Sequence, residues 1–118
     1  MVIIVGMIYK ICERPSWHAA EHDGSYRGSR LDARDGFIHF STAAQLAETA
    51  ARHFAGQTDL MLVAVDGDML GPALKWEPSR GGDLFPHLYA ALPLGAVSWS
   101  RPLLDEVGGT RALPELKP

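Results

Sequence analysis

Short apolar segments and segments with helical periodicity follow one another along the first third of the chain. Residues 8–12 alternate β-favouring side chains and predict a strand. Pro15 suits the first turn of a helix, because the N–H group that it lacks is not needed there, and this helix would end before Gly24. Residues 25–35 are mostly polar, so we expect a loop over the surface.

The next segment predicts a short strand followed by a helix. Residues 37–40 are apolar with one polar residue among them, which favours a strand. Thr42 and Gln45 have the spacing of a capping box, in which each side chain bonds the other residue's backbone N–H. Apolar residues then recur every three or four positions, which predicts an amphipathic helix that Gly56 ends.

The second half of the chain predicts a series of strands. Residues 60–65 are apolar without interruption, which is typical of a strand buried on both faces. Residues 74–77 predict another strand, and 78–83 predict a glycine-containing loop. We expect two further short strands at residues 88–92 and 96–99.

The order of these elements predicts an α+β fold in a single domain that spans residues 1–118. Residues 106–118 contain prolines and paired glycines, so we expect a loosely packed tail. Residues 1–6 are apolar but too few for an export signal or a membrane span, and they read as an extension if Met7 is the natural start.

Charge and cysteine content narrow the classes of function. The net charge is −3, and the arginines are dispersed except for Arg27, Arg30 and Arg34, so we expect no general nucleic-acid binding. That cluster could still hold one small anion. Cys12 is the only cysteine, which fits a reducing compartment, and we expect a cytoplasmic protein.

His39 is the first candidate for chemistry. It lies within an apolar strand, and the alternation places it on the same face as Ser41. If that face lines a cleft, His39, Ser41 and Thr42 meet at the end of a strand and the start of a helix, where free N–H groups favour a phosphate or carboxylate. The alternative is a core histidine bonded to backbone, with Thr42 as an ordinary cap.

The segment Phe-Pro-His-Leu-Tyr at residues 85–89 is the second candidate. Alternation along a strand places His87 and Tyr89 on one face, where the two rings could stack on a base or sugar. The alternative is a structural strand whose tyrosine covers the core with its hydroxyl group in water.

Glu77 is the candidate carboxylate. It follows Trp76, and a carboxylate beside a large aromatic ring can be desolvated, which raises its pKa as a general acid or base requires. The alternative is a solvated residue at the end of a strand. His39 and His87 do not have the HxH or HxxxH spacing of metal ligands, so we expect no metal.

Two motifs together resemble a known family. The sequence GFIHFST at residues 36–42 and FPHLY at 85–89, with IYKI at 8–11 and Trp17, resemble small bacterial proteins with plant relatives. That family is catalogued as domain of unknown function nine-five-two. The resemblance covers residues 7–103, and the family supplies no function of its own.

A second resemblance implies chemistry. The succession of strand, helix, IHxS motif, helix and apolar strand resembles the RNA 2′-phosphotransferases, which belong to the ADP-ribosyltransferase superfamily. The resemblance implies two small, mostly antiparallel sheets with flanking helices and NAD in the cleft between them. The resemblance implies that His39 helps to hold NAD or a substrate phosphate. It also implies that Tyr9 and Lys10 match the position in the first strand where the superfamily usually has His or Arg, and that Glu77 matches the catalytic glutamate.

Two hypotheses for function follow. In the first, the protein is an enzyme that handles NAD or ADP-ribose. His39, Ser41 and Thr42 hold phosphate or ribose, Tyr89 or Trp76 stacks on nicotinamide or adenine, and Glu77 stabilises charge at the ribosyl carbon. In the second, the same cleft binds a nucleotide or small anion without catalysis. Both predict that His39 and His87 face one cleft, and the enzyme requires Glu77 to line it as well.

Overall fold

The computed structural model describes residues 5–118. The proposed N-terminal extension therefore lies mostly outside the described residues. At its end, the backbone N–H of Val5 donates a hydrogen bond to Asp68, and Gly6 accepts one from Gly67. No described helix is both long and apolar enough to cross a membrane.

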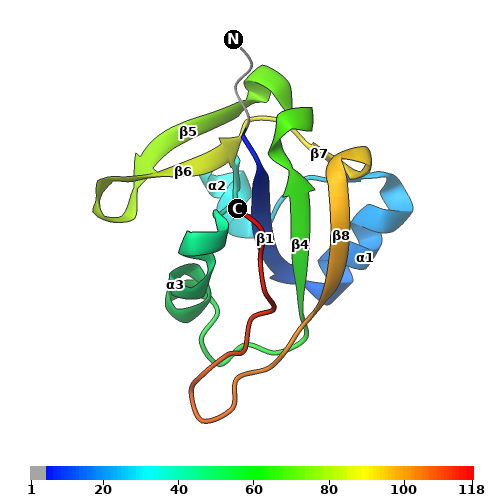
Figure 1. The fold of residues 1–118 in the computed structure, drawn as a ribbon. Helices are drawn as coiled ribbons and strands as arrows, with labels where there is room; N and C mark the ends of the chain where they lie inside the picture. The colour runs from blue at the N-terminus through cyan, green and yellow to red at the C-terminus, as the bar shows by residue number, and fades with distance from the viewer. Residues whose placement is uncertain (1–4) are drawn as a thin grey trace.

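A three-stranded antiparallel sheet forms the centre of the molecule (Figure 1). It contains β1 (Met7–Glu13), β4 (Leu60–Asp66) and β8 (Val97–Leu103), with β4 in the middle. Residues 60–65 are all buried in β4, which confirms the strand predicted from the unbroken apolar run. β8 extends further than the four residues expected from the sequence.

Two smaller sheets complete the architecture, where we expected one. The first joins β3 (Ile38–His39), β6 (Asp83–Leu88) and β5 (Leu74–Ser79) in that order, and β5 and β6 form a hairpin that projects from the body (Figure 1). The second pairs β2 (Ser25–Tyr26) with β7 (Leu92–Pro93). The strand expected at residues 88–92 is wrong, because β6 ends at Leu88 and a bend separates it from β7.

Three α-helices surround these sheets. α1 (Arg14–Asp23) ends at Gly24, as predicted, where the backbone turns left-handed with φ of 90°. α2 (Arg30–Asp35) and the strand β2 occupy the segment that we expected to be a loop, so that prediction is wrong. The third helix is α3 (Ala43–His53); Phe54 caps its C-terminus, so Gly56 does not end the helix as predicted.

Short 3₁₀ turns connect several of the strands. They span Gly67–Met69, Gly71–Ala73, Arg80–Gly82 and Leu94–Ala96.

The central sheet has a hydrophobic cluster on each face, and alternation along β1 and β4 explains both. Ile8 and Cys12 of β1 point to the side of α1 and the small sheets, whereas Tyr9 and Ile11 point to the side of α3. A strand between two clusters needs apolar residues at every position, which is why the sequence of β4 shows no alternation. Lys10 shares the face of Ile8 and Cys12 and is 7% exposed.

The C-terminal tail is held more closely than we expected. Leu113 and Leu116 pack against the cluster on the α3 side, and the hydroxyl group of Tyr9 donates a hydrogen bond to the carbonyl of Lys117. Arg111 donates to the carbonyls of Phe54 and Gln57. Figure 1 shows the tail returning along β1, where the backbone N–H of Met7 donates to the carbonyl of Pro118.

Candidate functional site

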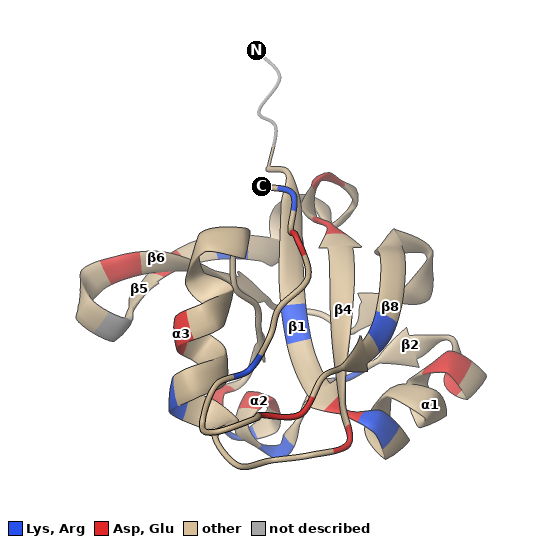
Figure 2. Ribbon diagram, turned by 60° about the horizontal axis from the view of Figure 1, so that its bottom comes forward, with Lys and Arg blue, Asp and Glu red and all other residues tan. Residues whose placement is uncertain are grey.

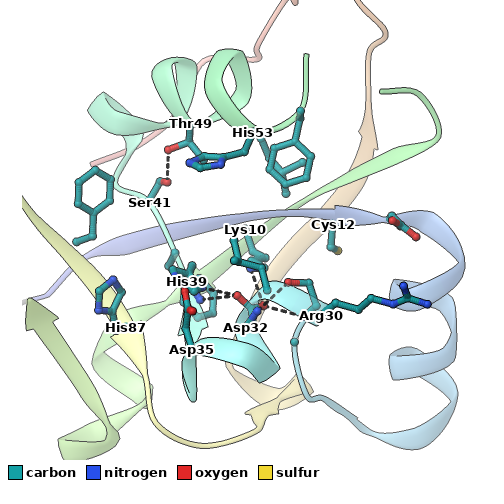
Figure 3. A pocket seen from close by; sticks show the side chains of 18 of the residues that line it. Lys10, Cys12, Arg30, Asp32, Asp35, His39, Ser41, Thr49, His53 and His87 are labelled. Atoms are coloured by element: carbon teal, nitrogen blue, oxygen red, sulfur yellow. Dashed lines mark hydrogen bonds and ion pairs between the residues drawn. The ribbon is translucent and has the colours of Figure 1, made fainter. Parts of the chain in front are cut away.

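A cleft of about 1190 Å³ opens beside the central strand β1. Its walls come from β1, α2, β3 and β6 on one side and from α3 on the other. His39 and His87 both line it, as do Lys10 and Ser41 (Figure 3). The prediction that the two histidines face one cleft is therefore confirmed.

Asp32 is the centre of the polar network in the cleft. Its side chain is 1% exposed, with one carboxylate oxygen 2.8 Å from Nζ of Lys10 and the other 2.6 Å from Nδ1 of His39. Backbone N–H groups of Ser29 and His39 also donate to it. Figure 3 shows the carboxylate between Lys10 and His39. The buried carboxylate is thus bonded by groups from β1, from β3 and from the start of its own helix.

The environment of Asp32 keeps it ionised. Burial by itself would raise its pKa, but the hydrogen bond from His39 and the positive charge and hydrogen bond of Lys10 outweigh burial and hold the pKa well below its usual range. Gly28 allows this burial: a Cβ at Gly28 would lie 2.7 Å from Cβ of Asp32, and its φ of 100° disfavours other residues.

His39 is held on both of its ring nitrogens. Nδ1 faces Asp32, and Nε2 lies 3.0 Å from a carboxylate oxygen of Asp35. Asp35 follows Asp32 by about one turn of α2. Carboxylates only accept hydrogen bonds, so both contacts together require a proton on each nitrogen. The ring thus lies between two carboxylates of α2.

His87 lies directly opposite His39 because the two residues are paired between β3 and β6. Their ring centroids are 5.4 Å apart, with the rings edge to face, and Phe37 stacks on His87 at 4.0 Å. Nδ1 of His87 is 2.9 Å from Oε1 of Glu77, and the hydroxyl group of Tyr89 donates to the same oxygen at 2.6 Å. His87 and Tyr89 thus lie on the same side of the strand, as the alternation predicted.

Glu77 differs from its prediction in two respects. The hydrogen bonds from Tyr89 and His87 lower its pKa, so the raised pKa expected beside Trp76 is wrong. Glu77 is also absent from the residues that line the cleft and lies behind His87.

Ser41 and Thr42 lie at the start of α3, but only Ser41 faces the cleft. Its hydroxyl group is hydrogen bonded to that of Thr49 at 2.8 Å. Thr42 is the N-cap, and its hydroxyl group accepts from the backbone of Gln45 while the Gln45 side chain accepts from the backbone of Thr42. The predicted capping box is confirmed, and the ligand contact expected of Thr42 is not supported.

Tyr9 and Trp76 lie away from the cleft. Tyr9 is 1% exposed on the opposite face of β1 from Lys10, where burial raises the pKa of its hydroxyl group. Trp76 pairs with Pro86 in the hairpin, whereas His87 pairs with Lys75, so Trp76 and His87 are on opposite faces. Neither side chain lines the cleft, so this geometry does not support the ligand contacts predicted for Tyr9 and Trp76.

Five further charged residues line the cleft: Asp32, Asp35 and Arg52, which were not predicted from the sequence, and Arg30 and Arg34, which belong to the arginine cluster expected to be able to hold a small anion. Four of the five belong to α2, which we had expected to be a loop. Ser29 and Asp32 have the spacing of a capping box, and this signal could have revealed the helix. Figure 2 shows that basic and acidic residues are mixed on the helices of the molecule as a whole.

Comparison with known proteins identifies the family of this chain. A family model described as "Protein of unknown function (DUF952)" matches residues 11–100. The chain belongs to this DUF952 family. The resemblance noted from the two sequence motifs is thereby confirmed. No curated protein matched the chain.

The DUF952 chain is also similar to solved structures of protein CC0527 from Caulobacter crescentus. The crystal structure is 46% identical, with a TM-score of 0.86 over 90% of this chain and 93% of that one. The solution NMR structure is 47% identical, with a TM-score of 0.79 over 89% and 90% of the two chains. These structures share the fold of the DUF952 chain and add no activity to it.

The DUF952 site has the side chains of an acid–base or anion site. Within residues 5–118, no group of three or more His, Cys, Asp or Glu side chains could hold a metal ion. The cleft instead offers three imidazoles, together with arginine and lysine side chains. Two of these imidazoles, those of His39 and His87, are each bonded to a carboxylate.

Proposed function

We propose that the cleft of this DUF952 protein binds a small nucleotide-like anion. NAD and ADP-ribose are the ligands implied by the resemblance to the RNA 2′-phosphotransferases. The observation that carries the proposal is the pairing of His39 with His87 inside a cleft lined by basic side chains.

The charges of the lining favour an anion. The protein has a net charge of −3, yet the lining contains Lys10, Arg30, Arg34 and Arg52 against three carboxylates, Glu13, Asp32 and Asp35. The sum is four positive charges and three negative ones, or +1. Asp32 is already bonded to Lys10 and His39, so it is not available to repel a phosphate.

The size of the cleft favours a ligand as large as a dinucleotide. Small-molecule sites commonly measure roughly 300–1,000 Å³, and this cleft measures about 1190 Å³. Phe40 and Phe85 provide apolar surface within it for a base or ribose. Ser41 provides a hydroxyl group that could bond a ribose or phosphate oxygen.

Isothermal titration calorimetry with NAD, ADP-ribose, AMP and inorganic phosphate tests this proposal. We expect NAD or ADP-ribose to bind more tightly than inorganic phosphate, and Arg30→Ala and Arg52→Ala each to weaken binding. Arg101→Ala is the matched control, because Arg101 lies over the ring of Trp99 and does not line the cleft. If none of the four compounds binds, or if all three variants bind alike, the proposal is wrong.

A second candidate is an enzyme that hydrolyses or transfers the ribosyl group of such a ligand. The hydrogen bond between Glu77 and His87 favours it, because carboxylate–imidazole pairs are common in acid–base catalysis. The position of Glu77 behind His87 counts against direct contact between Glu77 and a ribosyl carbon. Release of nicotinamide from NAD separates this candidate from binding alone.

A further inference from the structure

The geometry points to His87 as the general base of the cleft, with Glu77 as the residue that positions it. This inference rests on the proposed binding of a nucleotide-like ligand and adds a chemical step to it. The substrate class is an N-ribosyl pyridinium compound such as NAD, and the proton that His87 takes comes from water.

Of the two histidines paired between β3 and β6, only His87 has a ring nitrogen free to accept a proton. His39 has Nδ1 on Asp32 and Nε2 on Asp35. His87 has Nδ1 on Glu77, and across residues 5–118 no partner bonds its Nε2. The pairing of β3 with β6 thus places a fixed imidazole and a proton acceptor side by side.

Glu77 determines which nitrogen of His87 is free. Its pKa is lowered by the hydrogen bonds from Tyr89 and His87, so the group is a carboxylate and can only accept. Nδ1 of His87 must therefore carry the hydrogen, which leaves the lone pair on Nε2. Phe37, stacked at 4.0 Å with 23° between the ring planes, fixes the orientation of the imidazole.

The carboxylate also favours the product of proton transfer. When Nε2 takes a proton, the ring becomes a cation, and Glu77 at 2.9 Å stabilises the charge. The charged and titratable groups that face His87 are Glu77 and Lys75 from β5, Tyr89 next to β6, and His39 from β3.

The step balances without a further reactant. Nε2 of His87 removes one proton from a water molecule, and the water oxygen forms a bond to the anomeric carbon of the ribose. The bond between that carbon and the pyridinium nitrogen breaks, and its electron pair stays on the nitrogen, so neutral nicotinamide leaves. The products are ADP-ribose, nicotinamide and a protonated His87, which returns its proton to solvent.

The test measures NAD binding and nicotinamide release in the same set of variants, between pH 5 and pH 9. The wild type should release nicotinamide at a rate that rises with pH as a single group loses its proton. His87→Gln should lower that rate by roughly 10²–10⁴-fold, the usual contribution of a general base. Glu77→Gln should lower it by a smaller factor and shift the pH profile, while its NAD affinity stays within about threefold of wild type, since Glu77 does not line the cleft.

Glu21→Gln is the matched control. Glu21 lies next to His18 on the exposed surface of α1, so the same chemical change is made at a Glu–His pair outside the cleft. This variant should keep both the rate and the pH profile of the wild type. Thermal melting of each variant identifies any loss of activity that comes from unfolding.

A second readout does not depend on turnover. ¹⁵N NMR of the His87 ring should show a hydrogen on Nδ1 in the wild type and a changed tautomer population in Glu77→Gln. If NAD binds but nicotinamide is not released, or if His87→Gln keeps the wild-type rate and pH profile, the inference is wrong and the binding function stands. If NAD does not bind at all, the inference and the binding of NAD fail together.

Discussion

At the scale of single residues, Asp32 connects three elements of the cleft. It belongs to α2, bonds Lys10 on β1 and His39 on β3, and accepts from the backbone of Ser29. Burying a carboxylate is costly unless its oxygens are bonded, and these four-way contacts offset that cost. The consequence is that Lys10, itself 7% exposed, has Asp32 as its only ion-pair partner among residues 5–118.

We expect Asp32→Ala to lower the free energy of unfolding by about 3–5 kcal/mol, because it leaves the buried ammonium group of Lys10 without a partner. Asp35→Ala is the control: the side chain of Asp35 is 29% exposed, and a surface ion pair contributes less than about 1 kcal/mol. Urea unfolding followed by tryptophan fluorescence measures both. Similar losses in the two variants would show that the Lys10–Asp32 pair is not buried in solution.

Cys12 should react slowly with alkylating reagents although it lines the cleft. Burial raises the pKa of its thiol to about 12, and the nearby charge of Lys10 only partly opposes this. The thiolate is the reactive form, so little of it is present at pH 8. Mass spectrometry should show slow labelling by iodoacetamide in buffer and rapid labelling in urea. Equal rates in the two conditions would contradict a buried thiol.

At the scale of elements, α2 and α3 form parts of opposite walls of the cleft, and both helices begin with a capping box. Ser29 and Asp32 form a capping box at α2, and Thr42 and Gln45 form one at α3. α2 has six residues, too few for a helix to be stable by itself, so it depends on its cap and on the contacts of Asp32.

Ser29→Ala and Thr42→Ala should each cost about 1 kcal/mol of stability. The two changes should differ at the site, because only Ser29 is joined through Asp32 to His39. NMR should therefore show larger shifts of the His39 ring signals in Ser29→Ala than in Thr42→Ala. Equal shifts, or none in either variant, would mean that α2 does not position His39.

At the scale of the whole molecule, the elements with strong local patterns were predicted correctly. β1, α1, α3 and β4 each follow from an alternation, a cap or an apolar run within their own residues. The segment at residues 25–35 failed because β2 has two residues and α2 six, and neither is long enough to show a period. An α+β fold was thus predictable, whereas its third sheet and second helix were not.

Only the part of the candidate site that depends on alternation of side chains along a single strand was predictable from the sequence. His39 and His87 each stood out within an apolar strand, and their pairing places them together. Asp32 is 22 positions from Lys10 and 7 from His39, and no local pattern encodes such contacts. The geometry does not support the role given to Tyr9, because its side chain is 1% exposed and its hydroxyl group bonds the carbonyl of Lys117 outside the cleft.

The stability of the whole molecule should fall in acid because of the carboxylates in and beside the cleft. Hydrogen bonds and nearby charges hold the pKa of Asp32, Asp35 and Glu77 below their usual range in the folded protein. In the unfolded chain the same groups take up protons at higher pH, so below their unfolded pKa of roughly 4 the unfolded state binds more protons. The stabilisation is therefore fully present above that pH and is lost as pH falls through the folded-state values.

Urea unfolding between pH 7 and pH 2 should show this decrease, and Asp32→Asn should make it shallower, because that variant lacks the buried group with the largest shift among the three. Glu106→Gln is the control, since Glu106 bonds the backbone of Gly56 at an exposed position outside the cleft. Its curve should run parallel to that of the wild type. If the Asp32→Asn curve also runs parallel, the acid sensitivity comes from other carboxylates and the folded pKa of Asp32 is not depressed.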